Sequence, residues 1–152
     1  EWIALDLLSQ AEHDENAQSI LITNDKKFAK LVEDQVAKLL ENLPRKQIAS
    51  TSWHNNGLVL IVENLRECID IINHIAPEHL QFCIENPKVY LDKIRNAGSI
   101  FLGKYTPLKQ LEIILLAQIM FCQQVVQLGF LVALVLMIFY GEQHLFNVMS
   151  KI

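Results

Sequence analysis

The sequence predicts an α/β protein with three layers around a mostly parallel sheet, followed by a helical, apolar C-terminal tail. Short β-prone runs alternate with segments of helical periodicity over residues 1–107, as in sheets whose parallel strands are joined by crossover helices. Only four charged residues follow this region: Lys109, Glu112, Glu142 and Lys151. We therefore divide the chain into an α/β domain, residues 1–107, and an apolar tail, residues 108–152.

The first half of the domain begins with a helix over residues 2–13. Its apolar positions recur at helical spacing, at Ile3, Leu7, Leu8 and Ala11. The run SILIT (19–23) predicts a short strand, and the Asn24-Asp25 pair after it can cap the next helix. That helix keeps one apolar face until Pro44 ends it.

The second half of the domain repeats this alternation. The continuous apolar run GLVLIV (57–62) follows an Asn-Asn-Gly turn and predicts a strand buried on both faces. We expect a helix at about 64–74, then the apolar run PEHLQFCI. A helix started by Pro87 and the run SIFLG (99–103) complete the pattern. Crossovers between such parallel strands are right-handed as a rule.

Charge and cysteine content exclude some classes of function. The net charge is −4 and the pI about 5.7, which gives no electrostatic reason to bind nucleic acid. The three cysteines, Cys68, Cys83 and Cys122, are odd in number, and no CxxC occurs. This pattern suits a reducing compartment and argues against a disulfide framework or a cysteine zinc site. We expect a cytoplasmic protein.

The stretch LLSQAEHD places Gln10 and His13 three residues apart on one helical face. A side-chain amide and an imidazole in this arrangement can hold one small ligand or cation. The alternative is an ordinary solvated helix face, and spacing alone does not decide between the two.

The stretch IAPEHL places Glu78 and His79 directly after a proline. Pro77 fixes its own φ and favours extended geometry at Ala76, which would hold the dipeptide on a defined turn. A carboxylate beside an imidazole is a plausible acid/base pair, because burial and a neighbouring charge can bring both pKa values toward neutrality. The alternative is the entry of a strand that carries two polar residues.

The other histidines of the domain fit no spacing pattern, and we interpret His54 and His74 as structural or surface residues. Gly57, Gly98 and Gly103 have the positions of turn glycines. The sequence contains neither a GxGxxG motif nor a Walker loop.

Taken in order, DLLSQAEHD, ILIT, LPR, NHIAPEHLQF and NAGSIFLGKYTP resemble histidinol dehydrogenase over residues 1–107. The resemblance implies part of an incomplete Rossmann-like α/β domain. It also implies NAD-dependent oxidation of L-histidinol to L-histidine through the aldehyde, in histidine biosynthesis, by a homodimer with one zinc ion per site. By motif, Gln10 and His13 match zinc ligands that also contact substrate. His79 matches the general base, which also contacts substrate, and Glu78 matches the residue that activates water.

Other parts of the family pattern are not readable here. The NAD-contacting segments lie upstream in the family, so we assign no cofactor-binding residue in this chain. The remaining zinc ligands normally follow YTP, as an Asp in a GDY motif and a C-terminal His, together with a substrate-contacting Glu. His144 lies in GEQHLFN, which does not match. We therefore expect a fragment that is inactive alone.

The genetic code offers an explanation for the tail. The family continues after YTP with a stretch close to EAIGDYIAGPNHVLP. Codons for LKQLEII, from Leu108 onward, can spell EAIGDY when read two nucleotides later. Three shifted residues are fixed by the code and match the family: Met120-Phe121 gives Val, Phe121-Cys122 gives Leu, and Met137-Ile138 gives Asp. We interpret residues 108–152 as an out-of-frame, non-homologous segment.

The alternative takes the tail at face value, as the membrane tether of a small interaction protein built on an α/β remnant. Residues 125–140 are nearly all apolar. Glutamines interrupt the longer stretch, and the unbroken run from Leu128 is shorter than the roughly 20 residues that a membrane span needs. We therefore do not expect a membrane anchor.

Overall fold

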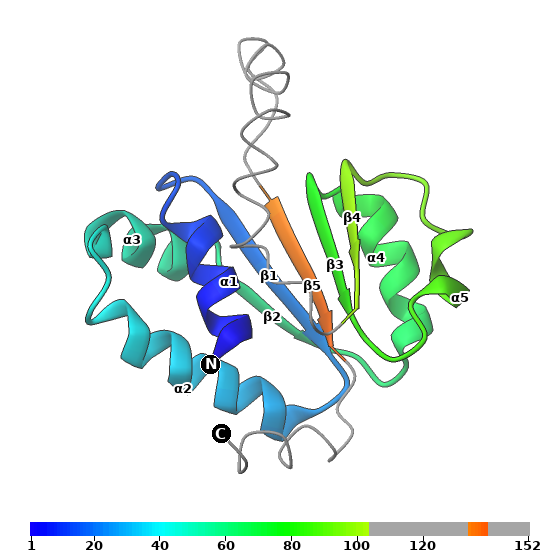
Figure 1. The fold of residues 1–152 in the computed structure, drawn as a ribbon, viewed down its shortest axis with the longest axis horizontal. Coiled ribbons are helices and arrows are strands. Elements are labelled where there is room, and N and C mark those ends of the chain that lie inside the picture. The colour runs from blue at the N-terminus through cyan, green and yellow to red at the C-terminus, as the bar shows by residue number, and fades with distance from the viewer. Residues whose placement is uncertain (104–133, 140–152) are drawn as a thin grey trace, which may run out of the picture.

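The computed structural model describes residues 1–103 and 134–139, which form a sheet with helices on both faces (Figure 1). In these residues five parallel strands pair in the order β2-β1-β5-β3-β4. The strands are β1 (Gln18–Thr23), β2 (Leu58–Ile61), β3 (His79–Cys83), β4 (Ser99–Leu102) and β5 (Leu134–Phe139). The helices are α1 (Trp2–Ala11), α2 (Lys26–Leu40), α3 (Lys46–Asn56), the 3-10 turn η1 (Leu65–Glu67), α4 (Cys68–Ile75) and α5 (Lys88–Leu91).

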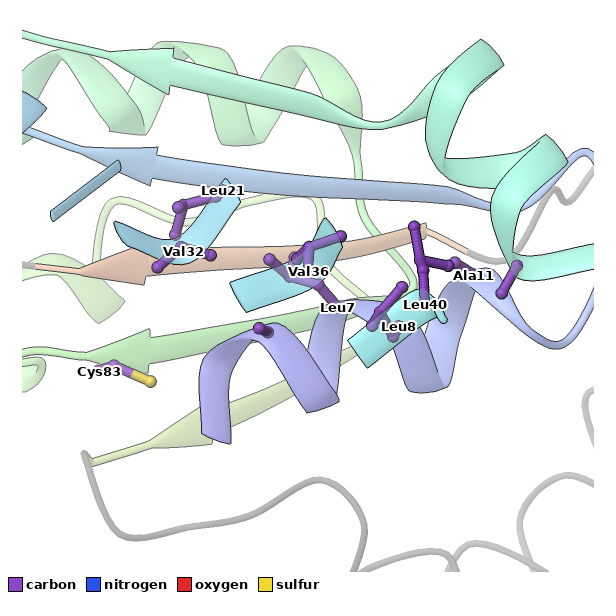
Figure 2. Packing of buried hydrophobic residues seen from close by; sticks show 10 residues of the cluster. Leu7, Leu8, Ala11, Leu21, Val32, Val36, Leu40 and Cys83 are labelled. Atoms are coloured by element: carbon purple, nitrogen blue, oxygen red, sulfur yellow. The ribbon is translucent and has the colours of Figure 1, made fainter. Parts of the chain in front are cut away.

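Apolar side chains pack against both faces of the sheet, as expected of a parallel sheet between two helical layers, and the polar Ser19, Thr23 and Gln81 are buried with them. Along β1, Leu21 packs in the cluster formed with α1, α2 and α3, whereas Ile20 and Ile22 pack in the cluster formed with η1 and α4. Figure 2 shows the first cluster, with Leu7 of α1 and Val36 of α2 facing the sheet. The α/β class with parallel strands is therefore confirmed.

The sequence predicted the start of α2 correctly from its N-cap. The Asp25 side chain accepts hydrogen bonds from the backbone N–H groups of Lys27 (2.8 Å) and Phe28 (3.1 Å), and so caps the first turn of the helix. The buried side chains of α2 are Ala29, Val32, Val36 and Leu40, whereas Leu31 is 45% exposed. The helix ends at Leu40, before the predicted stop at Pro44.

Two expectations for the middle of the chain were wrong or incomplete. The strand β2 was predicted to be buried on both faces, but it is an edge strand, with Leu58 40% and Ile61 47% exposed. An apolar run does not reveal whether a strand gains a neighbour on each side. The helix α3 was not predicted, because it buries little beyond Ala49 and Ser52 and has no clear apolar stripe.

The expectation of a helical tail is wrong for residues 134–139, which form the strand β5 in the middle of the sheet (Figure 1). The run LVLMIF is rich in residues that favour strands, and pairing on both edges satisfies its backbone. Residues 104–133 and 140–152, which include the rest of the tail, lie outside the described part of the chain. Within the described residues, no helix is long and apolar enough to cross a membrane.

Candidate functional site

Gln10 lies in the last turn of α1 and is only 5% exposed. Its side-chain nitrogen Nε2 has no hydrogen-bond partner among the described residues. A buried amide without a partner costs about 1–3 kcal/mol. An unpaired buried group of this kind is characteristic of a site that is completed by something else, such as a ligand or another segment.

His13 follows α1 and is exposed. Its backbone N–H donates to the Gln10 carbonyl oxygen at 3.2 Å, which continues the helical path past Ala11. The next residues turn the chain into β1, because the Asp14 side chain accepts a hydrogen bond from the Asn16 backbone N–H at 2.7 Å. The α1 end thus presents Gln10 from within the fold and His13 from its surface.

The Glu78-His79 dipeptide enters β3 through a turn different from the one predicted. Ala76 was expected to be extended, but its φ of 53° and ψ of 59° are left-handed. It ends α4, and its N–H donates to the Ile72 carbonyl oxygen at 2.8 Å. The helix cap therefore overrides the preference for extended geometry before Pro77.

The start of β4 fixes the same turn. The Gly98 N–H donates to the Pro77 carbonyl oxygen at 2.9 Å, and the Ser99 N–H donates to the Glu78 carbonyl oxygen at 2.7 Å. A Cβ atom at Gly98 would lie 2.6 Å from the Glu78 oxygen, so the position requires glycine for this close approach. The motif NAG therefore supports the motif PEH across the sheet.

Asn73 is a supporting residue that the sequence reasoning did not single out. Its Nδ2 donates to the Lys93 carbonyl oxygen at 3.0 Å, and its Oδ1 accepts from the N–H groups of Arg95 (2.7 Å) and Asn96 (3.3 Å). The Asn96 side chain donates back to the Asn73 carbonyl oxygen at 2.8 Å. The sequence did contain a signal for this role, because an asparagine near the end of a helix often forms hydrogen bonds with the backbone of a neighbouring loop.

His79 is the first residue of β3 and is partly buried. Its ring lies 6.1 Å from the Phe101 ring, centroid to centroid, at an interplanar angle of 59°. Burial lowers the pKa of His79 below its ordinary value; Glu78 opposes this shift and the charge of His13 adds to it. The lowered pKa favours a neutral His79 imidazole near pH 7.

The candidate site lies at the amino ends of the strands. His79 opens β3 opposite Ser99 of β4 and Val135 of β5, and the loop with His13 leads into the amino end of β1. In open α/β sheets a dinucleotide usually binds outside the carboxyl ends. The histidines are thus not in the place where this fold would be expected to hold NAD.

The described residues contain no group of three or more His, Cys, Asp or Glu side chains placed to hold a metal ion. Gln10 and His13 together offer an amide oxygen and an imidazole nitrogen at the end of α1, where the helix dipole favours positive charge. Burial raises the pKa of the Cys68 and Cys83 thiols to about 12, so both stay protonated in the core. The donor set fits one part of a zinc site with nitrogen and oxygen ligands.

The sheet, its two helical layers and the polar site at its amino ends define a doubly wound α/β protein with an imidazole- and carboxylate-bearing site. The family model described as histidinol dehydrogenase matches residues 1–118. The chain therefore belongs to the histidinol dehydrogenase family.

Similar proteins bear the same family name. Histidinol dehydrogenase 1 of Nostoc sp. is 53% identical over 107 residues, which cover 70% of this chain and 25% of the relative. The histidinol dehydrogenase of Listeria monocytogenes is 56% identical over 104 residues, 68% of this chain and 24% of the relative. The crystal structure of histidinol dehydrogenase from Elizabethkingia anophelis superposes with a TM-score of 0.69 at 41% identity, and covers 72% of this chain and 25% of that one. The chain spans about a quarter of the length of these relatives.

Proposed function

We propose that residues 1–107 carry part of the catalytic centre of a histidinol dehydrogenase, a homodimeric enzyme that oxidises L-histidinol to L-histidine through the aldehyde. The observation that carries this proposal is the His79 environment. Burial keeps its imidazole neutral beside Glu78 and near His13, so a ring nitrogen is available to accept a proton at neutral pH. We further propose that this chain alone is inactive.

In this proposal Glu78 and His79 have different roles. His79 takes the hydroxyl proton of the alcohol and also contacts the substrate. Glu78 takes a proton from the water that attacks the aldehyde carbon. Support for both roles comes from the turn, because hydrogen bonds from Gly98 and Ser99 fix the backbone that carries them.

Gln10 and His13 would hold the zinc ion and contact the substrate. When bound, zinc orients the imidazole and amine of the substrate. The buried Gln10 side chain supports this role, because zinc would bind its Oε1 atom and an acceptor atom of the substrate would satisfy the Nε2 donor, which has no partner among the described residues. The remaining zinc ligands and the NAD contacts would come from segments outside residues 1–107, and NAD would accept the hydride.

A chimera tests the catalytic roles. Residues 1–107 would replace the matched 107 residues of the Nostoc relative, which are 53% identical. We expect this chimera to reduce NAD with L-histidinol, and the His79→Gln chimera to lose about 10²–10⁴-fold in kcat. The matched control is His74→Gln, because His74 is an exposed histidine five residues earlier and should leave kcat unchanged. An active His79→Gln chimera would refute the assignment.

Zinc binding gives a second readout that does not depend on turnover. In the same chimera, His13→Ala and Gln10→Ala should each weaken zinc affinity about 10–100-fold, measured by competition with a chelator. The half-buried Glu12 lies between them, and Glu12→Ala should not change the affinity. If the zinc affinity is unchanged in both variants, Gln10 and His13 are not zinc ligands.

We also propose that residues 108–152 are translated out of frame, with the boundary near Pro107. The curated relatives above align over 104 and 107 residues, which fits such a boundary, although the family model extends to residue 118. The test is the nucleotide sequence across Thr106 to Leu108 and through the tail. A shifted frame that spells GDY and then GPNHVLP supports the proposal, and a frame that spells nothing similar to the family removes it.

A further inference from the structure

The segment 12–17 joins α1 to β1 and carries His13. Hydrogen bonds within the segment shape its turn. The Ala17 N–H donates to the Asp14 carbonyl oxygen at 3.0 Å, and the Asn16 N–H donates to the Asp14 side chain at 2.7 Å. Because these bonds join residues two or three apart in sequence, they do not fix the segment relative to the rest of the fold. That requires contacts with another element.

The helix α3 makes such contacts, and it lies beside the segment in Figure 1. The Ser52 Oγ atom donates to the Ala17 carbonyl oxygen at 2.8 Å. The Asn56 Nδ2 atom donates to the Glu15 carbonyl oxygen at 3.1 Å. Ser52 and Asn56 are four residues apart and therefore share one face of the helix. This face thus holds two carbonyl groups of the segment, both of them shortly after His13.

The end of α3 that carries Asn56 is itself held in place. The Gly57 N–H donates to the Trp53 carbonyl oxygen at 3.0 Å, and a Cβ atom at Gly57 would lie 2.5 Å from that oxygen. The position therefore requires glycine for this close approach. Ser52 is only 1% exposed, so its hydroxyl group needs a partner within the protein, and the Ala17 carbonyl group provides one.

We propose that Ser52 and Asn56 are positioning residues, which hold the segment 12–17 so that the His13 imidazole is available to zinc beside Gln10. The inference rests on the proposed zinc role of His13. The two candidate ligands are held differently, because Gln10 is buried in α1, whereas His13 is exposed and depends on the segment after the helix. Removal of a group that orients a metal ligand typically weakens metal affinity about 10–100-fold.

The first experiment tests the anchor without zinc, in the full chain. Asn56→Asp replaces the donor amide with a carboxylate, which cannot donate to the Glu15 carbonyl group. The matched control is Asn55→Asp, which adds the same charge at the exposed neighbouring residue. Measured by mass spectrometry, hydrogen exchange in residues 12–17 should be about tenfold faster in Asn56→Asp than in the parent, with α2 unchanged. Asn55→Asp should exchange like the parent, and equal exchange in the two variants would overturn the proposal.

The second experiment measures zinc affinity by competition with a chelator, in the chimera described above. We expect Asn56→Asp and Ser52→Ala each to weaken the affinity about tenfold, and Asn55→Asp to leave it unchanged. Faster exchange without a change in zinc affinity would overturn the proposal, because α3 would then stabilise the turn without positioning a ligand. If Ser52→Ala does not fold, the result for Asn56→Asp decides.

The variant His13→Ala, measured in the same chimera, separates this inference from the proposed function. If His13→Ala weakens zinc affinity and Asn56→Asp does not, the positioning role is wrong and the zinc role of His13 stands. If His13→Ala leaves the affinity unchanged, the zinc role is wrong, and the positioning role is overturned with it.

Discussion

The two halves of the candidate site are built in different ways. The Glu78-His79 turn is fixed by the chain itself, through backbone bonds from Gly98 and Ser99. The end of α1 is not completed in this way, because His13 is exposed and the buried Gln10 Nε2 has no hydrogen-bond partner within residues 1–103 and 134–139. The fold therefore fixes the backbone of the proposed acid/base pair, whereas the proposed ligand-binding half would need groups from elsewhere.

The largest effect should come from filling the close approach at Gly98. In Gly98→Ala the new Cβ would lie 2.6 Å from the Glu78 carbonyl oxygen, and a backbone atom cannot move aside without disturbing the β3–β4 pairing. We expect a loss of about 2–3 kcal/mol in the free energy of unfolding, measured by urea denaturation. Ser99→Ala keeps every backbone bond and should stay within about 0.5 kcal/mol of the parent. Equal stability of the Gly98→Ala and parent chains would show that the turn is not rigid.

Removal of the second support of the turn should have a smaller effect. Asn73→Ala loses three side-chain hydrogen bonds to the segment that leads into β4, all of them partly exposed to water. We expect a loss of about 1–2 kcal/mol in urea denaturation. The neighbouring His74→Ala is the control, and it should change little because His74 is exposed. If the two variants are equally stable, Asn73 does not support the turn.

A substitution at the end of α1 should raise the free energy of unfolding rather than lower it. Gln10→Met removes the unpaired amide and keeps the volume of the side chain. We expect the free energy of unfolding to rise by about 1 kcal/mol in the absence of metal, because the cost of the buried amide disappears. The same substitution should weaken zinc binding in the chimera. A destabilised Gln10→Met chain would mean that the amide already has a partner, and the contrast between the two halves would fail.

The smallest effect concerns the protonation of His79. Its pKa in the folded chain is lowered, so below pH of about 6.5 the unfolded chain binds a proton that the folded chain does not. Stability is therefore complete above that pH and falls as the pH drops below it. His79→Gln removes this slope, while the other titrating groups remain. Urea denaturation from about pH 7.5 to 5 should show the parent losing stability relative to the variant. Parallel curves would contradict a neutral, buried His79.

Much of the fold could be predicted from short patterns. The cap at Asp25, the apolar face of α2, the run that became β1 and the turn at Gly103 (φ 108°) are local signals with local causes. The helix α3 could not be predicted, because its two buried residues, Ala49 and Ser52, do not form an apolar face with helical spacing. Ala76 was misjudged because the cap of α4 and the proline after it favour different geometries, and the cap prevailed.

By itself the sequence determined the alternation of strands and helices, the identity of the polar side chains and the resemblance carried by QAEH, APEHL and NAG. These features depend on neighbours in the chain. Only the tertiary structure decided that Gln10 is buried, that β2 is an edge and that residues 134–139 pair between β1 and β3. The physical reason is that strand pairing and burial depend on contacts between residues far apart in sequence. An apolar run such as LVLMIF can satisfy its backbone as a helix or as a strand, and the open edges of β1 and β3 determine which.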